Sequence, residues 1–145
     1  MIKAACLLHD VNWRAHPDYR AEVCFDTATR ANLAGLSHKE RIYLGLSLMH
    51  RYRNRTEGHR FENLVPLLSD ADQREAEVLG RAMRFGAMLW ITPDVNIGDK
   101  SWAPRKRLLT LKLSKETAPL FGEVAQARFA SLTQSLEAES HVKGL

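Results

Sequence analysis

The residues best suited to chemistry in this sequence are the adjacent His9 and Asp10, which lie in the largely apolar run from Ala4 to Trp13. An imidazole nitrogen and a carboxylate oxygen are both ligands for a divalent metal ion. At the end of an apolar helix such a doublet presents both ligands together, and we expect the two side chains to lie in or near the core. The alternative is a core histidine that bonds to Asp10 or to a backbone carbonyl.

A second group of residues is suited to binding phosphate. The arginine side chain is a planar fork of donors that matches phosphate oxygens. The group lies in two stretches, near residues 14–20 and 50–55, and could converge on one face. It consists of Arg14, Arg20, His50, Arg51, Arg53 and Arg55. The alternative for the second stretch is a solvated helix end, where cations complement the helix dipole.

The charge is uneven along the 145 residues, whose formal net charge is +4. Residues 1–60 and 100–145 each carry a net +4, and residues 61–99 carry −4. Two basic ends favour an anionic partner. No stretch reaches the ~18 apolar residues of a membrane span, and no signal-peptide pattern is present, so we expect a cytoplasmic location. Cys6 and Cys24 have apolar neighbours and are expected to be small buried hydrophobes.

Helical patterns account for most of the chain. Pro17 is suited to the first turn of a helix. Ser37 and Glu40 have the spacing of a capping box, which predicts a helix immediately after them. The expected helices span residues 17–32, 38–54, 70–91 and 118–138, and a short turn of helix is expected at about 61–68.

The helix expected over 70–91 is the longest, and its broad apolar stripe predicts that it is the central packing helix. Gly80 and Gly86 lie inside it. A glycine in a helix costs roughly 1 kcal/mol relative to alanine. We therefore expect another backbone to approach closely at both positions.

The pattern changes in the last third of the chain, where leucines alternate with polar residues over 109–113 and predict a half-buried strand. A single strand needs a partner, either a second short strand near 99–103, another subunit, or a segment upstream. An unpaired apolar edge favours self-association. The segment 93–104 is expected to be a loop, and the tail 140–145 to be frayed.

Four blocks of sequence carry a family resemblance. They are AACLLHDVNWRAHPDYRAE (residues 4–22), IYLGLSLMHRYR (42–53), GRAMRFGAML (80–89) and LTLKLS with LFGEV (109–124). In order and spacing they resemble the C-terminal region of the exopolyphosphatase/guanosine pentaphosphate phosphatase family, over roughly residues 4–139. The resemblance implies a mainly α fold. An HD-domain-like helical bundle over 1–92 would be followed by a small α+β segment over 93–145, with one or two short strands and a C-terminal helix.

The resemblance also implies what this chain lacks. In the family, N-terminal actin-like catalytic domains release the terminal phosphate from inorganic polyphosphate or guanosine pentaphosphate, and their glycine-rich loops hold phosphate. No such loop occurs in this sequence. We therefore expect an accessory domain that contributes polyanion binding and dimerisation. Its partners would be inorganic polyphosphate, the actin-like domains and a second copy. No cofactor is implied for this chain, and Mg²⁺ is a candidate only for the parent enzyme.

The His-Asp doublet is similar to the paired metal ligands of the HD superfamily of phosphohydrolases. An active HD site also needs a His on an earlier helix and an Asp on a later one. No His precedes His9, and Ala87 occupies the position of that Asp. The resemblance therefore implies a degenerate site with no catalytic residue, in which only His9 and Asp10 would hold a metal. Its residues would be His9, Asp10, His16 and His50.

Two other functions stay open, so the question of whether this chain is itself an enzyme stays open too. A stand-alone metal-dependent HD phosphohydrolase would use the same four residues around a metal, with water as the nucleophile. A nucleic-acid-binding module would use the two basic ends, although no recognised motif supports it. Nucleic acid is therefore the least favoured partner.

Overall fold

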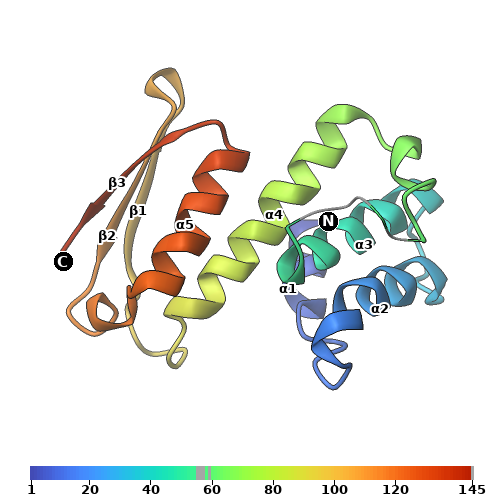
Figure 1. The fold of residues 1–145 in the computed structure, drawn as a ribbon, viewed down its shortest axis with the longest axis horizontal. Coiled ribbons are helices and arrows are strands. Elements are labelled where there is room, and N and C mark those ends of the chain that lie inside the picture. Colours follow the sequence, from blue (N-terminus) through green and yellow to red (C-terminus); the bar gives the residue numbers. More distant parts are fainter. Residues whose placement is uncertain (55–57, 59, 145) are drawn as a thin grey trace. The chain divides into compact units, whose positions relative to one another are not determined.

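The computed structural model describes residues 1–54, 58 and 60–144. It divides into two compact units, unit 1 (Met1–Met83) and unit 2 (Arg84–Leu145) (Figure 1). The fold is mainly α with a small α+β part, as predicted. In the described part of the chain, no helix is long and apolar enough to cross a membrane. The predicted pair of domains, 1–92 and 93–145, stays a prediction.

Unit 1 is built from helices, and for all but the first the sequence signals the start correctly. They are α1 (Ile2–Leu8), α2 (Pro17–Arg30), α3 (His38–Tyr52) and the first part of α4 (Asp70–Leu89). The capping box is present, since the Ser37 amide donates to Glu40 Oε2 at 2.7 Å and the Glu40 amide donates to Ser37 Oγ at 3.3 Å. The short turn of helix predicted within 61–68 is a single 3-10 turn at Val65–Leu67.

The core of unit 1 is organised around α3 rather than around the longest helix. Every residue of α3 from Ile42 to Arg51 is buried. By contrast, Val78, Leu79 and Ala82 of α4 are only half-buried. The prediction that the longest helix is central is therefore wrong, because a helix with one apolar stripe packs on one side, whereas a helix buried on most sides lies inside.

The two glycines of α4 have different surroundings. A methyl group added at Gly80 would overlap Ser47 O and the Cβ atom of His50, so α3 and α4 approach closely at this point. A methyl group at Gly86 would meet no described atom within 4 Å. The predicted close approach is therefore confirmed at Gly80 and wrong at Gly86.

Unit 2 contains a three-stranded sheet in the order β1-β2-β3. Strand β1 (Gly98–Ala103) pairs antiparallel with β2 (Leu108–Leu113), and β3 (Glu139–Lys143) pairs parallel with the other edge of β2. The predicted strand over 109–113 and its partner near 99–103 are confirmed. Because both edges of β2 are paired within the chain, the expectation that this strand drives self-association loses its basis.

Two expectations for the C-terminal part are wrong. The helix predicted over 118–138 is shorter, because α5 spans Glu123–Ser135 after a 3-10 turn at Ala118–Leu120. The tail is not frayed but forms β3. Most side chains of β3 are exposed, so backbone pairing with β2 orders the tail and no apolar pattern reveals it. The loop predicted over 93–104 is also shorter than expected, because β1 begins at Gly98.

The start of β3 is fixed by Arg107, at the turn between β1 and β2. Its side chain donates to Leu136 O and Glu137 O, both at 2.7 Å, and to Glu137 Oε2 at 2.9 Å. Its carbonyl accepts the Glu139 amide at 2.8 Å. Arg107 and Glu137 both adopt the left-handed backbone conformation, with φ of 46° and 48°. These bonds therefore hold two uncommon turns together at the point where β3 begins.

The core of unit 2 is aromatic. Phe85 from the end of α4 packs against Phe129 of α5 with ring centroids 4.9 Å apart, and Phe121 contacts both rings.

The two cysteines, both in unit 1, differ in environment: Cys24 is buried as predicted, whereas Cys6 is exposed. The prediction for Cys6 is wrong because α1 buries only Ala5.

Candidate functional site

The His-Asp doublet lies on the surface of unit 1. Helix α1 ends at Leu8, and His9 is its C-terminal cap. The His9 Nδ1 atom lies 2.7 Å from Cys6 O, and its Nε2 atom lies 3.4 Å from Asp10 Oδ2. The side chains of His9 and Asp10 are 44% and 53% exposed. The prediction that both lie in or near the core is therefore wrong, because the short helix ends and the chain turns outward at the doublet.

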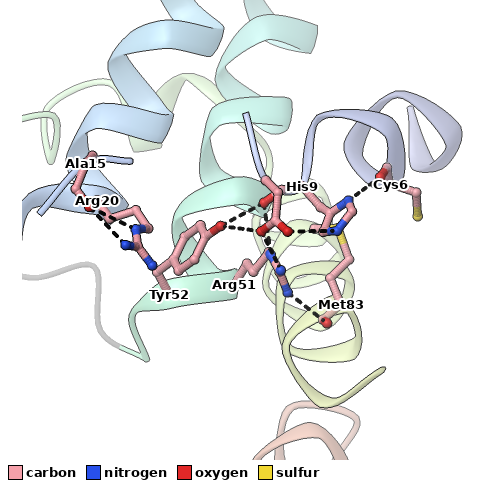
Figure 2. Close-up of polar contacts among 8 residues, drawn as sticks. Cys6, His9, Ala15, Arg20, Arg51, Tyr52 and Met83 are labelled. Atoms are coloured by element: carbon pink, nitrogen blue, oxygen red, sulfur yellow. Dashed lines mark hydrogen bonds and ion pairs between the residues drawn. The ribbon is translucent and has the colours of Figure 1, made fainter. Parts of the chain in front are cut away.

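The doublet is held by Arg51, from the end of α3, whose side chain is only 8% exposed. Arg51 donates from Nη2 to Asp10 Oδ1 at 2.7 Å, from Nε to His9 O at 2.9 Å and from Nη1 to Met83 O at 3.2 Å (Figure 2). The Tyr52 hydroxyl lies 2.9 Å from both His9 O and Asp10 Oδ1, which share its single proton. We call Arg51, Tyr52 and Asp10 the arginine clamp. It ties the segment after α1 to α3 and to α4.

The clamp determines the charge states of its members. Partial burial raises the pKa of the Asp10 carboxyl, but hydrogen bonds from Arg51 and Tyr52 outweigh it and hold that pKa below its usual value. Burial lowers the pKa of Arg51, and the hydrogen bond to Asp10 outweighs it and raises that pKa. Burial and the hydrogen bond to Asp10 both raise the pKa of Tyr52. At neutral pH the clamp is therefore an ion pair with a protonated tyrosine as a second donor.

In this arrangement a guanidinium competes with a metal ion for one oxygen of Asp10. One oxygen of Asp10 accepts from both Arg51 and Tyr52, and a guanidinium occupies the place of a cation beside it. His16 caps α2, where its ring accepts from the Asp18 amide at 3.3 Å. His50 is buried in α3 against Gly80. No group of three or more His, Cys, Asp or Glu side chains arranged to hold a metal occurs among the described residues.

The phosphate-binding candidates of the sequence lie partly together. Arg20 donates from Nε and Nη2 to Ala15 O at 3.1 and 2.9 Å. The guanidinium carbons of Arg20 and Arg51 lie 5.4 and 5.2 Å from the centre of the Tyr52 ring (Figure 2). The end of α3 and the start of α2 therefore bring two arginines to one tyrosine.

The other candidates are dispersed. Arg53 pairs with Glu22 of α2 at 3.6 Å. Arg14 is exposed and lies 5.1 Å from the centre of the Trp13 ring. His50 is only 4% exposed, so it faces the core rather than a ligand. Arg55 lies outside the residues that the structure describes.

Sequence reasoning missed Tyr52, which binds both Asp10 and the backbone of His9. Its position next to Arg51 in a block with a family resemblance was the available signal. The polar partner of a surface doublet is set by tertiary contacts more than 40 residues away along the chain, and no local pattern reports them.

The structure therefore defines a mainly α domain with a surface His-Asp doublet that is clamped by arginine. The model of the family "Exopolyphosphatase, C-terminal" matches residues 1–139. The chain belongs to this exopolyphosphatase C-terminal family, and the predicted resemblance is confirmed. The comparison with curated proteins found no match.

Proposed function

We propose that the chain is a non-catalytic accessory domain that binds inorganic polyphosphate for an exopolyphosphatase-type protein. The observation that supports this proposal is the placement of Arg20 and Arg51 on the same Tyr52 ring. Arg14 and Arg53 are close to these two in the sequence, and we call the four residues the arginine cluster of unit 1. Two carboxylates, Asp10 and Glu22, pair with Arg51 and Arg53, so the four guanidinium groups keep a net charge of +2 for an anion.

The members of the cluster have different roles in this proposal. Arg51 is buried and its charge is neutralised by Asp10, so it acts as a positioning residue. Arg14 and Arg53 are more accessible, and Arg20 retains one nitrogen beyond the two that bind Ala15 O. These three side chains would contact phosphate, with guanidinium forks that match its oxygens.

The test is binding of the chain to long-chain polyphosphate as a function of salt. Log affinity should fall linearly with log salt, because bound counterions are released. Replacing Arg14, Arg20 and Arg53 by Gln should flatten this slope by up to about three units, roughly one per lost phosphate contact.

The matched control replaces three exposed arginines outside the cluster by Gln. They are Arg30, Arg60 and Arg74. The control loses the same charge and should keep the slope. An equal loss in both variants would mean that only net charge matters, and it would contradict the proposed site.

A metal-dependent phosphohydrolase is the less favoured alternative, because Arg51 occupies the cation position beside Asp10. We expect no release of phosphate from polyphosphate or guanosine pentaphosphate by the purified chain with Mg²⁺ or Mn²⁺. Metal-dependent turnover that is lost in Asp10→Ala would overturn this expectation. The HD-domain-like origin of unit 1 and the actin-like partner domains stay predictions.

We also propose that the chain forms a homodimer through the exposed apolar side chains of its first 13 residues. Leu7 is 75% and Trp13 60% exposed, and Ile2 and Val11 are exposed in the same segment. Exposed apolar groups of this kind favour association. Sedimentation at ~100 μM, well above a typical micromolar dissociation constant, should give a dimer. Leu7→Ser should give a monomer, and a monomeric parent chain would contradict the proposal.

A further inference from the structure

Strand β1 forms one edge of the sheet of unit 2. The order of the sheet is β1-β2-β3, so β1 pairs with β2 on one side and its other side is an outer edge. The four residues from Asp99 to Trp102 are all exposed. An exposed edge strand is a template on which a further strand can pair.

The hydrogen bonds of the sheet identify the backbone groups of β1 that point outward. The Ser114 amide donates to Ile97 O at 3.3 Å, one step beyond the pair of Gly98 and Leu113. Hydrogen-bonded and non-hydrogen-bonded pairs alternate along an antiparallel ladder. The pairs that include residues 99, 101 and 103 are therefore hydrogen-bonded. It follows that the N–H and C=O groups of Lys100 and Trp102 point away from β2, and none of these four groups has a backbone partner outside the ladder among the described residues.

The side chains of Lys100 and Trp102 lie on the helix-covered face of the sheet but remain accessible. Lys100 is opposite Leu111, and Trp102 is opposite Leu109. Leu111 is buried on the face along which α5 lies (Figure 1), whereas Trp102 is 43% exposed. A strand added to β1 would place one side chain against the Trp102 ring and another, two residues away, beside the Lys100 ammonium group.

The charge around this edge is positive after the neighbouring anions are counted. Residues 94–112 carry five Lys or Arg and two Asp, and Arg107 pairs with Glu137. Five cations against three anions leave a net +2. Asp99 is opposite Lys112 on the other face of the sheet. The cations nearest the outer edge and the turn after it are exposed; they are Lys100, Arg105 and Lys106.

We propose that the outer edge of β1 binds an extended acidic polypeptide segment, which adds a fourth strand to the sheet. The segment carries an apolar or aromatic side chain opposite Trp102 and a carboxylate two residues away, opposite Lys100. A second carboxylate on the other side of the apolar residue meets Arg105 and Lys106. The inference does not rest on the proposed function, because it concerns a different partner and a different unit of the chain.

The backbone of the edge selects a polypeptide among anionic partners. Lys100 and Trp102 each present one N–H donor and one C=O acceptor on the outer side. Ionised phosphate oxygens only accept hydrogen bonds, so a phosphate chain would leave both carbonyls without a donor. An extended peptide presents donors and acceptors in the alternation that a sheet edge requires.

The charges select a different chain rather than a second copy. Pairing of β1 with β1 of another copy would bring the same cations together from both sides. A lysine on an edge strand opposes such self-pairing. An acidic strand instead places opposite charges across the new pair, which is the favourable arrangement.

The test titrates the full chain with the end-capped peptide Thr-Glu-Thr-Tyr-Thr-Glu-Thr and follows the backbone amide signals by NMR. The tyrosine and both glutamates of this probe fall on one face of a strand. Peptide concentrations up to about 5 mM detect even a millimolar dissociation constant. Saturable shifts should be centred on β1 and the turn after it. The amide hydrogens of Lys100 and Trp102 should exchange more slowly with solvent, because they gain acceptors.

Two further peptides of the same length separate strand pairing from charge. The first carries an N-methyl group on the tyrosine amide, which removes a donor that faces β1. The second replaces both glutamates by lysine. Both should bind much more weakly than the probe, and a probe-like titration with either of them would contradict the proposed strand or its charge.

Charge reversal at the edge provides the matched variants. Lys100→Glu should weaken binding of the acidic probe by at least about fivefold and should strengthen binding of the lysine peptide. The control is Lys143→Glu, which makes the same charge change on β3 at the opposite edge and should leave both affinities unchanged. Trp102→Thr keeps a β-branched residue in the strand and should weaken both peptides. Unchanged signals of β2 and α5 in each variant verify the fold.

Three results would overturn the inference. One is the absence of saturable shifts at Lys100 and Trp102, and another is a set of shifts centred on β3. The third is equal weakening in Lys100→Glu and Lys143→Glu, which would mean that only net charge matters. The Gln variant of Arg14, Arg20 and Arg53 should bind the probe like the parent chain, so failure of this inference is distinguishable from failure of the polyphosphate proposal.

Discussion

Replacing Arg51 by Met should destabilise unit 1 by about 2–4 kcal/mol, because it removes the clamp and keeps most of the apolar stem. Arg51 makes one hydrogen bond to a carboxylate and two to carbonyls. A hydrogen bond to a charged group contributes roughly 1.5–3 kcal/mol, and a neutral one about 1 kcal/mol. The side chain of Asp10 is half exposed, so water can solvate its carboxylate once Arg51 is replaced. The bond between Arg51 and Asp10 therefore contributes an energy in the lower part of that range.

The two carbonyl oxygens add little further penalty. His9 O still accepts from the Tyr52 hydroxyl. Met83 lies inside α4, where a carbonyl accepts the amide four residues later. Neither acceptor is left unpaired after the substitution, so the destabilisation should not reach the cost of orphaned buried groups.

The reasoning is tested by a double-mutant cycle with Asp10→Asn, measured as the free energy of unfolding in urea. Asp10→Asn alone leaves a buried cation without its anion and should cost about 1–3 kcal/mol. In the Arg51→Met background the same change should cost much less, which gives a coupling energy of about 1–2 kcal/mol. Arg53→Met is the matched control and should cost below about 1 kcal/mol, because its pair with Glu22 is long and partly exposed.

Two results would refute the clamp. One is a loss below about 1 kcal/mol for Arg51→Met. The other is an equal cost of Asp10→Asn in both backgrounds, since it would mean that the two side chains act independently despite the 2.7 Å contact.

Two further predictions concern α4 and acid stability. Gly80→Ala should destabilise unit 1 by about 1–3 kcal/mol, because the added methyl group overlaps Ser47 O. Gly86→Ala should stabilise the chain by up to about 1 kcal/mol, because alanine has the higher helix propensity and the methyl group meets no described atom. Thermal unfolding of both variants measures the difference. The lowered pKa of Asp10 contributes stability that is fully present above its ordinary value of 3.8 and is lost as pH falls through the lowered value. The stability difference between the parent chain and Asp10→Asn should therefore shrink in acid, and a constant difference from neutral pH to pH ~2 would contradict it.

The parts of the fold that the sequence predicted are those encoded by local patterns. The capping box at Ser37 and Glu40 fixed the start of α3, and the alternating leucines predicted β2. Strand β3 was missed because its side chains are exposed and its order comes from backbone pairing and from Arg107. Gly86 was misjudged because a helix glycine has the same sequence signal whether or not a backbone approaches it.

The sequence named His9, Asp10 and Arg51 as candidates but revealed neither Tyr52 nor the contacts among the four residues. The residue types of His9 and Asp10 predict metal ligands only if no other cation binds the carboxylate of Asp10. In the structure Arg51 of α3 binds one of its oxygens. Arg51 was predicted to bind phosphate or, alternatively, to lie in solvent at a helix C-terminus, where cations complement the helix dipole. The packing of α3 on most sides instead buries its last turn, so the arginine is directed inward to the doublet.

Arg51 is the partner that a metal ion would have to replace at one oxygen of Asp10. A divalent ion at Oδ1 of Asp10 would have to displace a guanidinium that is 8% exposed and whose other contacts are neutral carbonyls. That displacement would leave a buried cation without its anion, next to a second cation, and such a charge costs several kcal/mol. The same contacts of Arg51 anchor the segment after α1 to α3. Through Oδ1, Asp10 therefore serves as an anchor within unit 1.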